Sequence, residues 1–188
     1  MDLPTLTPVP VLSTARLELV PLGPEHLDGT WAALQEPEVL RLTGTHDRFT
    51  REGVETWLRS LADRDDRADW AILRREDGAH IGEVVLSDLD EENLSAGFRI
   101  ALAGPQWFGA GYGTEATRAV LRHAFDTVGL HRVELEVFAF NPRAQRAYEK
   151  AGFVVEGRRR HALRWQGDWV DAIVMGALAD GRVHTEPE

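Results

Sequence analysis

The sequence predicts an α/β fold in which strands and helices alternate along one mixed domain. Two patterns predict it: apolar residues recur at strand spacing in some segments and at helical spacing in the segments between them. Short turns rich in glycine, proline and acidic residues separate these segments, without a long linker or an internal repeat. Because 188 residues can bury a core without disulfides, we expect one domain over residues 1–188, with its core at about 13–178.

The front half is predicted to begin with a strand and two helices. Arg16–Leu22 alternates along its length and ends at a Gly-Pro turn, which indicates a strand. Apolar residues at helical spacing predict one helix over Glu25–Glu36 and a second after Thr50, whose hydroxyl can cap the first turn. Three successive strands joined by acidic turns then follow: Trp70–Arg74, Ala79–Leu86 and Ala96–Leu102.

The second half is predicted to alternate between helix and strand. Glu115–Val128 has one apolar face at helical spacing, and Arg132–Phe138 alternates as a strand. Asn141 and the proline after it are typical of a helix start, and Gly152 is typical of its end. Two more strands complete the chain, Phe153–Glu156 and Trp169–Leu178.

Residues 107–114, Trp-Phe-Gly-Ala-Gly-Tyr-Gly-Thr, are the most informative stretch. A glycine-rich turn before a helix directs unpaired backbone N–H groups at one point, where the helix dipole also favours negative charge. This arrangement predicts a phosphate site, although a flexible surface loop is the alternative. The P-loop pattern is missing because no Lys-Ser or Lys-Thr pair follows, and the dinucleotide fingerprint fails because its sixth position, counted from Gly109, is Thr114.

Composition restricts the classes of function. With 43% hydrophobic and 28% charged residues, the chain is typical of a soluble globular domain. The lack of cysteine excludes disulfides, thiolate metal sites and a cysteine nucleophile, and it fits a reducing cytoplasm. The seven histidines show no paired metal spacing, so we expect no metal. A net charge of −10 argues against nucleic acid or an anionic membrane as a partner, and no apolar run reaches eighteen residues.

The stretch from Gly109 to Gly157 resembles the cofactor-binding half of the GNAT acyltransferase superfamily. Its Gly-Tyr-Gly-Thr-Glu-Ala turn, Leu-His-Arg-Val and Glu-Lys-Ala-Gly-Phe segments are similar to those of the RimJ/RimL branch, which includes ribosomal-protein N-terminal acetyltransferases. The opening strand and helix and the closing strand resemble the same branch, so the match spans most of residues 13–178. The resemblance implies a mixed, strongly twisted and splayed central sheet flanked by helices.

The resemblance also implies acetyl-CoA as co-substrate. Backbone amides of the family's glycine turn hold the pyrophosphate, and they correspond here to Gly109, Ala110, Gly111, Tyr112, Gly113 and Thr114. The usual Gln or Arg at the head of the turn is replaced by Phe108. The pantetheine arm would lie between Phe98–Leu102 and Val137–Phe140, with the amides of Ile100 and Leu102 free to bond the thioester oxygen.

Asn141 and Tyr148 are candidate site residues on one helix. They are seven positions apart, about two turns, and therefore lie on one face. The resemblance implies that Tyr148 protonates or hydrogen-bonds the departing thiolate. Asn141 is a candidate cofactor contact, and Arg143 and Arg146, near the start of the same helix, are candidates for contacts to the phosphates. The alternatives are a helix N-cap for Asn141 and a core tyrosine for Tyr148.

The general base is harder to identify. Members of the branch commonly carry glutamate at the place of Ser95, so Glu83 on the preceding strand is our candidate base. Glu134 and Glu136 are further candidates, although their spacing is also that of a solvent-facing row. Water is the remaining alternative, since an α-amine has a pKa near neutrality.

The acceptor is expected to be a primary amine that attacks the thioester directly. The branch favours a protein N-terminus, and a small amine such as a polyamine, aminoglycoside or amino acid is the alternative. The acidic turn Asp88–Glu92 could lie beside the acceptor site and attract cationic amines. Arg158–His161 is either a solvated strand end or a contact for the CoA 3′-phosphate. A non-catalytic CoA-binding or interaction module remains the alternative function, and a homodimer remains open.

Overall fold

The computed structural model describes residues 5–181, whose strands form one eight-stranded sheet in the order β1-β2-β3-β4-β5-β6-β8-β7. The strands are β1 (Leu12–Ser13), β2 (Leu17–Pro21), β3 (Ala68–Arg74), β4 (His80–Asp90), β5 (Ser95–Leu102), β6 (Arg132–Phe138), β7 (Val154–Trp165) and β8 (Asp168–Leu178). The helices are η1 (Pro24–His26), α1 (Leu27–Ala33), α2 (Pro37–Thr43), α3 (Arg51–Ser60), η2 (Leu61–Asp63), η3 (Pro105–Trp107), α4 (Tyr112–Arg122), η4 (His123–Val128) and α5 (Pro142–Ala151). This architecture confirms the predicted mixed α/β fold.

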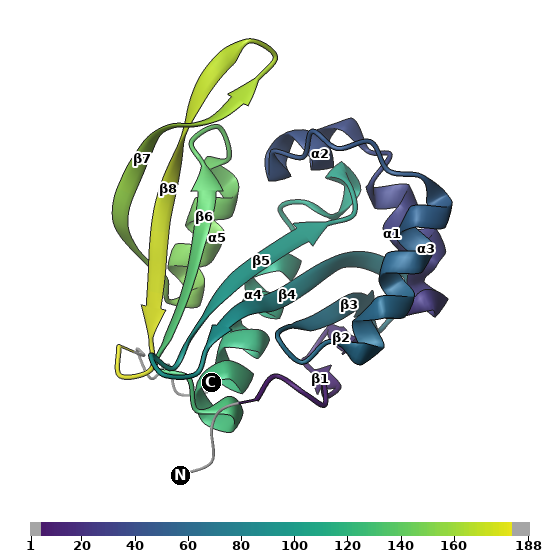
Figure 1. Cartoon of the computed structure of the whole chain (residues 1–188), viewed down its shortest axis with the longest axis horizontal. Coiled ribbons are helices and arrows are strands. Elements are labelled where there is room, and N and C mark those ends of the chain that lie inside the picture. Colours follow the sequence, from purple (N-terminus) through teal and green to yellow (C-terminus); the bar gives the residue numbers. More distant parts are fainter. Residues whose placement is uncertain (1–4, 182–188) are drawn as a thin grey trace.

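The sheet is splayed between β5 and β6. These strands pair in parallel only where Ser95–Gly97 lies beside Arg132–Glu134, whereas every other neighbouring pair of strands is antiparallel. The amides of His131 and Arg132 both donate to the carbonyl of Leu94 and fix the closed end of this V. Beyond it the two strands diverge (Figure 1).

Helices cover both faces of the sheet. The alternation of β3, β4 and β5 directs Trp70, Val84 and Phe98 into the main core, where they pack with the apolar face of α4 and with Tyr148 of α5. The opposite face carries Ala71, which packs with the smaller cluster formed by α1 and α3. The chain thus builds two layers of helices around one sheet, with a gap between β5 and β6 (Figure 1).

The structure departs from the predicted elements most clearly at α4, α2 and β7, and the helix predicted over Glu25–Glu36 is a 3-10 turn followed by α1, which ends at Ala33. The helix predicted from Glu115 begins at Tyr112 and becomes a π-helix at His123–Val128. Helix α2 was not predicted, although Pro37 at its first position and Gly44 at its end are typical helix signals. Strand β7 extends far beyond the predicted Phe153–Glu156, because its outer part forms a long hairpin with β8 instead of alternating against the core.

Two structural features are absent from residues 5–181. No helix there is both long enough and apolar enough to cross a bilayer. No group of three or more histidine, aspartate or glutamate side chains in this range is arranged to hold a metal ion.

Candidate active site

A cavity of about 480 Å³ occupies the open end of the V between β5 and β6. It receives side chains or backbone from α2, β4, β5, β6, the start of α4 and one face of α5. With the exception of Ala110, the predicted site residues all line it: Glu83, Ile100, Leu102, Gly109, Gly111, Tyr112, Gly113, Thr114, Asn141, Arg146 and Tyr148. The fold therefore brings together residues that lie up to 65 positions apart in sequence.

The start of α4 presents free backbone donors at one end of the cavity. Gly109 and Gly111 have φ of +79° and +84°, the left-handed region that side chains with a Cβ rarely adopt. The first intrahelical bond runs from the amide of Glu115 to the carbonyl of Gly111 at 3.0 Å. The N–H groups of residues 112–114 precede it and have no helical acceptor, which makes this end suitable for an anion.

Arg16 holds the glycine turn in place through three contacts. Its guanidinium donates to the carboxylate of Glu115 at 2.7 Å and to the carbonyl of Ala110 at 2.9 Å, and it stacks on the ring of Tyr112. Thr14 donates to the same carboxylate at 2.7 Å. The Glu115 charge is thus engaged by Arg16, and Ala110 faces this cluster, which explains why Ala110 does not line the cavity. Arg16 could not be predicted as part of this site, because it precedes a strand that is far from the turn in sequence.

Helix α5 adds positive charge beside the start of α4. The two helices are joined where Arg118 donates to the carbonyl of Lys150 at 2.6 Å. Arg143, Arg146 and Lys150 all line the cavity, and Arg143 lies over the ring of Phe108 at 4.1 Å. Phe108, which replaces the family's usual polar residue, therefore supports a cation that comes from another helix.

The backbone of β5 leaves two amides unpaired along the cavity. The amide of Ala103 bonds the carbonyl of Ile81 at 2.8 Å, which fixes the alternation of the ladder between β4 and β5. In an antiparallel pair every second residue bonds the partner strand, so the N–H groups of Ile100 and Leu102 point to the other side. There β6 has already diverged, and both amides face the gap.

Tyr148 lies where the cavity meets the core. Its ring packs edge-on against Phe98 and Phe153, with centroid distances of 6.3 Å and 5.9 Å. Burial raises the pKa of its phenol to about 12. In the described part of the chain its hydroxyl has no hydrogen-bond partner. Asn141 caps α5, its side-chain oxygen accepting from the amide of Ala144 at 3.1 Å, and it also lines the cavity.

Glu83 lies on the opposite wall, where β4 faces α1. One carboxylate oxygen accepts a hydrogen bond from the Thr30 hydroxyl. The same oxygen lies 3.6 Å from Nε2 of His80, a histidine whose two ring nitrogens are buried without a hydrogen-bond partner. Glu83 is 27% exposed, and no arginine or lysine pairs with it among residues 5–181. Its carboxylate is thus held by a neutral hydroxyl and remains open to the cavity.

Of the other charged strand residues near the cavity, Asp69 and Arg99 were not predicted, whereas Glu134 and Glu136 were further candidate bases. Asp69 is buried and receives a bidentate hydrogen bond from Arg67, with both distances 2.6 Å. Arg99 also lines the cavity and has no acidic partner in the described structure. Glu136 lines the cavity and pairs with Arg159, whereas Glu134 pairs with Arg132 outside the cavity. A sequence pattern predicts that charged residues on strands face solvent. Their position over a cavity depends on how the strands are arranged in the sheet.

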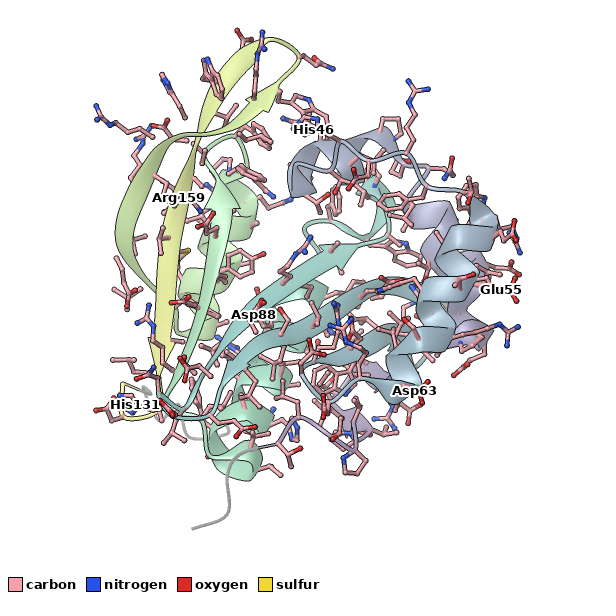
Figure 2. The ribbon with its side chains drawn as sticks, in the orientation of Figure 1. His46, Glu55, Asp63, Asp88, His131 and Arg159 are labelled. Atoms are coloured by element: carbon pink, nitrogen blue, oxygen red, sulfur yellow. The ribbon has the colours of Figure 1, made fainter. Side chains whose placement is uncertain are left out.

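The acidic turn does not lie beside the cavity. None of Asp88–Glu92 lines it, because the β4–β5 hairpin turns at the closed end of the V. Figure 2 shows Asp88 towards that end, His131 where the strands converge, and His46 at the opposite end between α2 and the β7–β8 hairpin. The eight residues of β5 at about 3.3 Å each span roughly 26 Å. The expectation that this turn lies beside the acceptor site is therefore wrong.

The basic run Arg158–His161 lies on β7, outside the cavity. Arg158 pairs with Asp171 at 2.6 Å and Arg159 pairs with Glu136. Figure 2 shows Arg159 on the β7–β8 side of the V. This run lies in the middle of β7 and not at a strand end, and ion pairs join two of its arginines to neighbouring strands.

Comparison with known proteins gives a consistent picture. A sequence model of the acetyltransferase (GNAT) domain family matches residues 16–154. FsC-acetyl coenzyme A-N(2)-transacetylase of Aspergillus fumigatus is 32% identical over 150 residues, which are 73% of this chain and 62% of that protein. The Bacillus subtilis protein named probable N-acetyltransferase YjcK is 32% identical over 135 residues, 70% of this chain and 75% of that protein. This chain thus spans less than two thirds of the first relative's length.

A solved structure is similar over nearly the whole chain. The spermidine N-acetyltransferase from Vibrio cholerae in complex with CoA and spermine has a TM-score of 0.81 at 22% identity, covering 89% of this chain and 98% of that one. At this identity the likeness shows the fold. The family match over residues 16–154, which is most of the chain, shows that this chain belongs to the GNAT family of acetyltransferases.

Proposed function

We propose that this protein transfers an acetyl group from acetyl-CoA to a primary amine, with both bound together and without an acyl-enzyme. The observation that carries the proposal is the gap between β5 and β6. It runs from the free donors of α4, past the unpaired amides of Ile100 and Leu102, to Glu83 and Tyr148 on facing walls. A donor site and a proton acceptor thus share one cavity of about 480 Å³.

The residues present fit acetyl-CoA. Its extended pantetheine arm carries amide groups, which the free backbone of β5 can bond as a neighbouring strand would. The donors at the start of α4 fit the pyrophosphate, and Arg143, Arg146 and Lys150 supply compensating charge. Gly109 and Gly111 supply the turn that aims these donors.

Glu83 serves as the general base in this mechanism. An acceptor amine that enters the cavity as an ammonium ion must lose a proton before it attacks, and the Glu83 carboxylate can receive it. Thr30 donates to one oxygen and so orients the carboxylate. His80, 3.6 Å from the same oxygen, is close enough to bond it after a small rotation of either side chain.

The remaining groups act on the thioester. The N–H of Ile100 or Leu102 donates to its oxygen as negative charge develops there, and such a donor is worth about 3 kcal/mol. The new bond joins the amine nitrogen to the acetyl carbon, and the carbon–sulfur bond breaks. The electron pair leaves with sulfur, and the Tyr148 hydroxyl donates a hydrogen bond to that thiolate. The second proton of the attacking nitrogen passes through solvent to the thiolate, which leaves as the CoA thiol, and Glu83 returns the first proton to solvent.

The acceptor class within this function is a separate question. A protein N-terminus, the acceptor implied by the RimJ/RimL resemblance, and a small amine both present a primary nitrogen. The similar proteins include a spermidine N(1)-acetyltransferase from Vibrio cholerae, 36% identical over 77 residues, and the Aspergillus N(2)-transacetylase. Both names describe acetyl transfer to a nitrogen atom, but the molecule that carries this nitrogen differs between them.

The test is release of CoA thiol from acetyl-CoA in the presence of a panel of amines and N-terminal peptides. We expect turnover that depends on the amine, and Glu83→Gln should lower kcat/KM by about 100-fold or more. Glu92→Gln, at the closed end of the V, is the matched control and should leave kcat/KM unchanged. Acetyl-CoA binding without turnover of any amine would favour the non-catalytic module, and equal activity of the two variants would remove Glu83 as base.

A further inference from the structure

We propose that the acceptor is a small amine that also carries a carboxylate, with Arg99 binding the carboxylate while Glu83 receives the amine. The inference rests on the acetyl transfer proposed above and names the class of its second substrate. The side of the cavity lined by β3, β4 and β5 is called the acceptor wall below. The inference follows from the one cation and the one carboxylate that, among residues 5–181, other groups leave uncompensated on this wall.

Arg99 and Glu83 share one face of the sheet. In the β4–β5 register, Arg99 lies opposite Val85 and Glu83 lies opposite Ala101. The two charged residues are therefore diagonal neighbours, whose Cβ atoms lie about 7 Å apart in an antiparallel pair. Their side chains leave the sheet on the same side, and both line the cavity. A molecule between them can contact both charges at once.

The other charges of the cavity are already compensated or serve its donor end. Arg67 is held bidentately by Asp69, and Glu136 is paired with Arg159. Arg143, Arg146 and Lys150 come from α5, which contacts the first turn of α4 where the Thr114 hydroxyl donates to the carbonyl of Ala147 at 3.5 Å. Among the described residues that line the acceptor wall, this leaves Arg99 without a carboxylate and Glu83 without a guanidinium or ammonium.

Arg99 is badly placed for the donor's phosphates. It precedes Ile100, whose amide faces the thioester, and it is ten positions ahead of Gly109 at the phosphate end. The part of the donor that passes β5 is the uncharged pantetheine arm. The natural partner of Arg99 is thus an anionic group of the acceptor, and a planar guanidinium matches a carboxylate with two parallel hydrogen bonds.

The charge pattern discriminates between amine classes. A polyamine carries at least two ammonium groups, and only one of them could pair with Glu83. The second would lie near the positive charge of Arg99, and this repulsion lowers the affinity for polyamines. A peptide N-terminus has a neutral amide where a free amino acid has its carboxylate. A free amino acid, or a small amine of similar design, presents one positive and one negative group a few bonds apart and complements both residues.

The experiment compares matched acceptors. For wild-type protein we expect L-amino acids to give kcat/KM values about 10- to 100-fold above those of their carboxamides, of spermidine and of peptides that begin with alanine or aspartate. Arg99→Gln should abolish this preference through KM and leave the carboxamides unchanged, and Arg99→Lys should restore part of it. Arg160→Gln, an exposed strand arginine on β7, is the control and should behave as wild type.

A binding measurement separates this inference from the proposed function. Calorimetric titration of L-amino acids and their carboxamides into the protein–CoA complex should show binding of the acids alone, lost in Arg99→Gln. Turnover or binding without preference for the carboxylate would overturn this inference and leave acetyl transfer intact. Binding of the acids without turnover of any amine would support the Arg99 site and contradict the proposed function. Preference for spermidine or for the aspartyl peptide would assign the acceptor to those classes instead.

Discussion

Replacing Tyr148 by phenylalanine removes one hydroxyl from the junction of the cavity and the core. The ring packs against Phe98 and Phe153, and phenylalanine can keep both contacts. The hydroxyl has no partner in the described structure, so its loss leaves no donor or acceptor unpaired. The free energy of unfolding should therefore change by less than about 1 kcal/mol. An effect on turnover would then report on chemistry and not on folding.

The size of that effect follows from the pKa of the phenol. Burial raises the pKa of Tyr148 to about 12, whereas a thiol resembling that of CoA has a pKa of about 8.5. Complete transfer of the phenol proton to the thiolate would be unfavourable by this difference of about 3.5 in pKa, which corresponds to about 5 kcal/mol. A hydrogen bond to the charged sulfur is the favourable alternative, and bonds to charged groups are worth about 1.5–3 kcal/mol. We expect kcat to fall by about 10- to 150-fold.

The assay is CoA thiol release at saturating acetyl-CoA, with single-turnover mixing to isolate the chemical step. Acetyl-CoA affinity of Tyr148→Phe should match wild type. Because the donor form of a phenol whose pKa is about 12 persists at lower pH, Tyr148 should cause no loss of kcat between pH 7 and about 10. A chemical step of normal rate in the variant would refute the catalytic role and leave Tyr148 as a core residue.

Three further predictions concern the glycine turn, α1 and the main core. Gly111→Val should raise the Kd for acetyl-CoA, measured by calorimetry, at least tenfold. The control is Gly129→Val, at a similar φ of +82° with open space around it: each variant should lose about 1–2 kcal/mol of folding stability, but Gly129→Val should leave the Kd unchanged. Equal Kd values in both variants would contradict the phosphate site. Gly29→Ala places a Cβ 2.4 Å from the His80 ring and should lower the free energy of unfolding by about 1–3 kcal/mol in urea titrations, and an unchanged midpoint would contradict that packing. Burial lowers the pKa of His123, so the stability that its neutral form contributes is complete above about pH 6.5 and is lost as pH falls through the lower folded-state pKa. His123→Gln should therefore flatten the plot of unfolding free energy against pH in this range. An unchanged slope would exclude His123 as the source of that pH dependence.

Much of the fold could be predicted because local patterns and tertiary structure agree. Leu17 and Leu19 alternate with exposed residues and are both fully buried, as strand spacing requires. The cap at Asn141 and the helix end at Gly152 are present because their signals depend on backbone chemistry close by in sequence. The glycine turn could be predicted for the same reason. Its backbone needs φ values near +80° at alternate positions, and few residues other than glycine adopt them.

The acceptor wall could not be predicted from the same patterns. Asp69 and Arg99 lie on strands whose charged positions usually face water, and their place over a cavity depends on how far β5 and β6 diverge. The acidic turn Asp88–Glu92 lies away from the glycine turn in space although only one strand separates the two in sequence. An antiparallel hairpin separates its turn from its open end by the full length of the strand.

Direct transfer in a ternary complex is the central claim, and intact-protein mass measured after incubation with acetyl-CoA tests it most directly. Without an amine, the account predicts an unmodified protein and no CoA thiol above background, because no residue of the cavity serves as a nucleophile. With a competent amine, free CoA and acetylated amine should appear in equal amounts. A protein that gains an acetyl group from acetyl-CoA alone, and passes it to the amine when the amine is added later, would contradict the account.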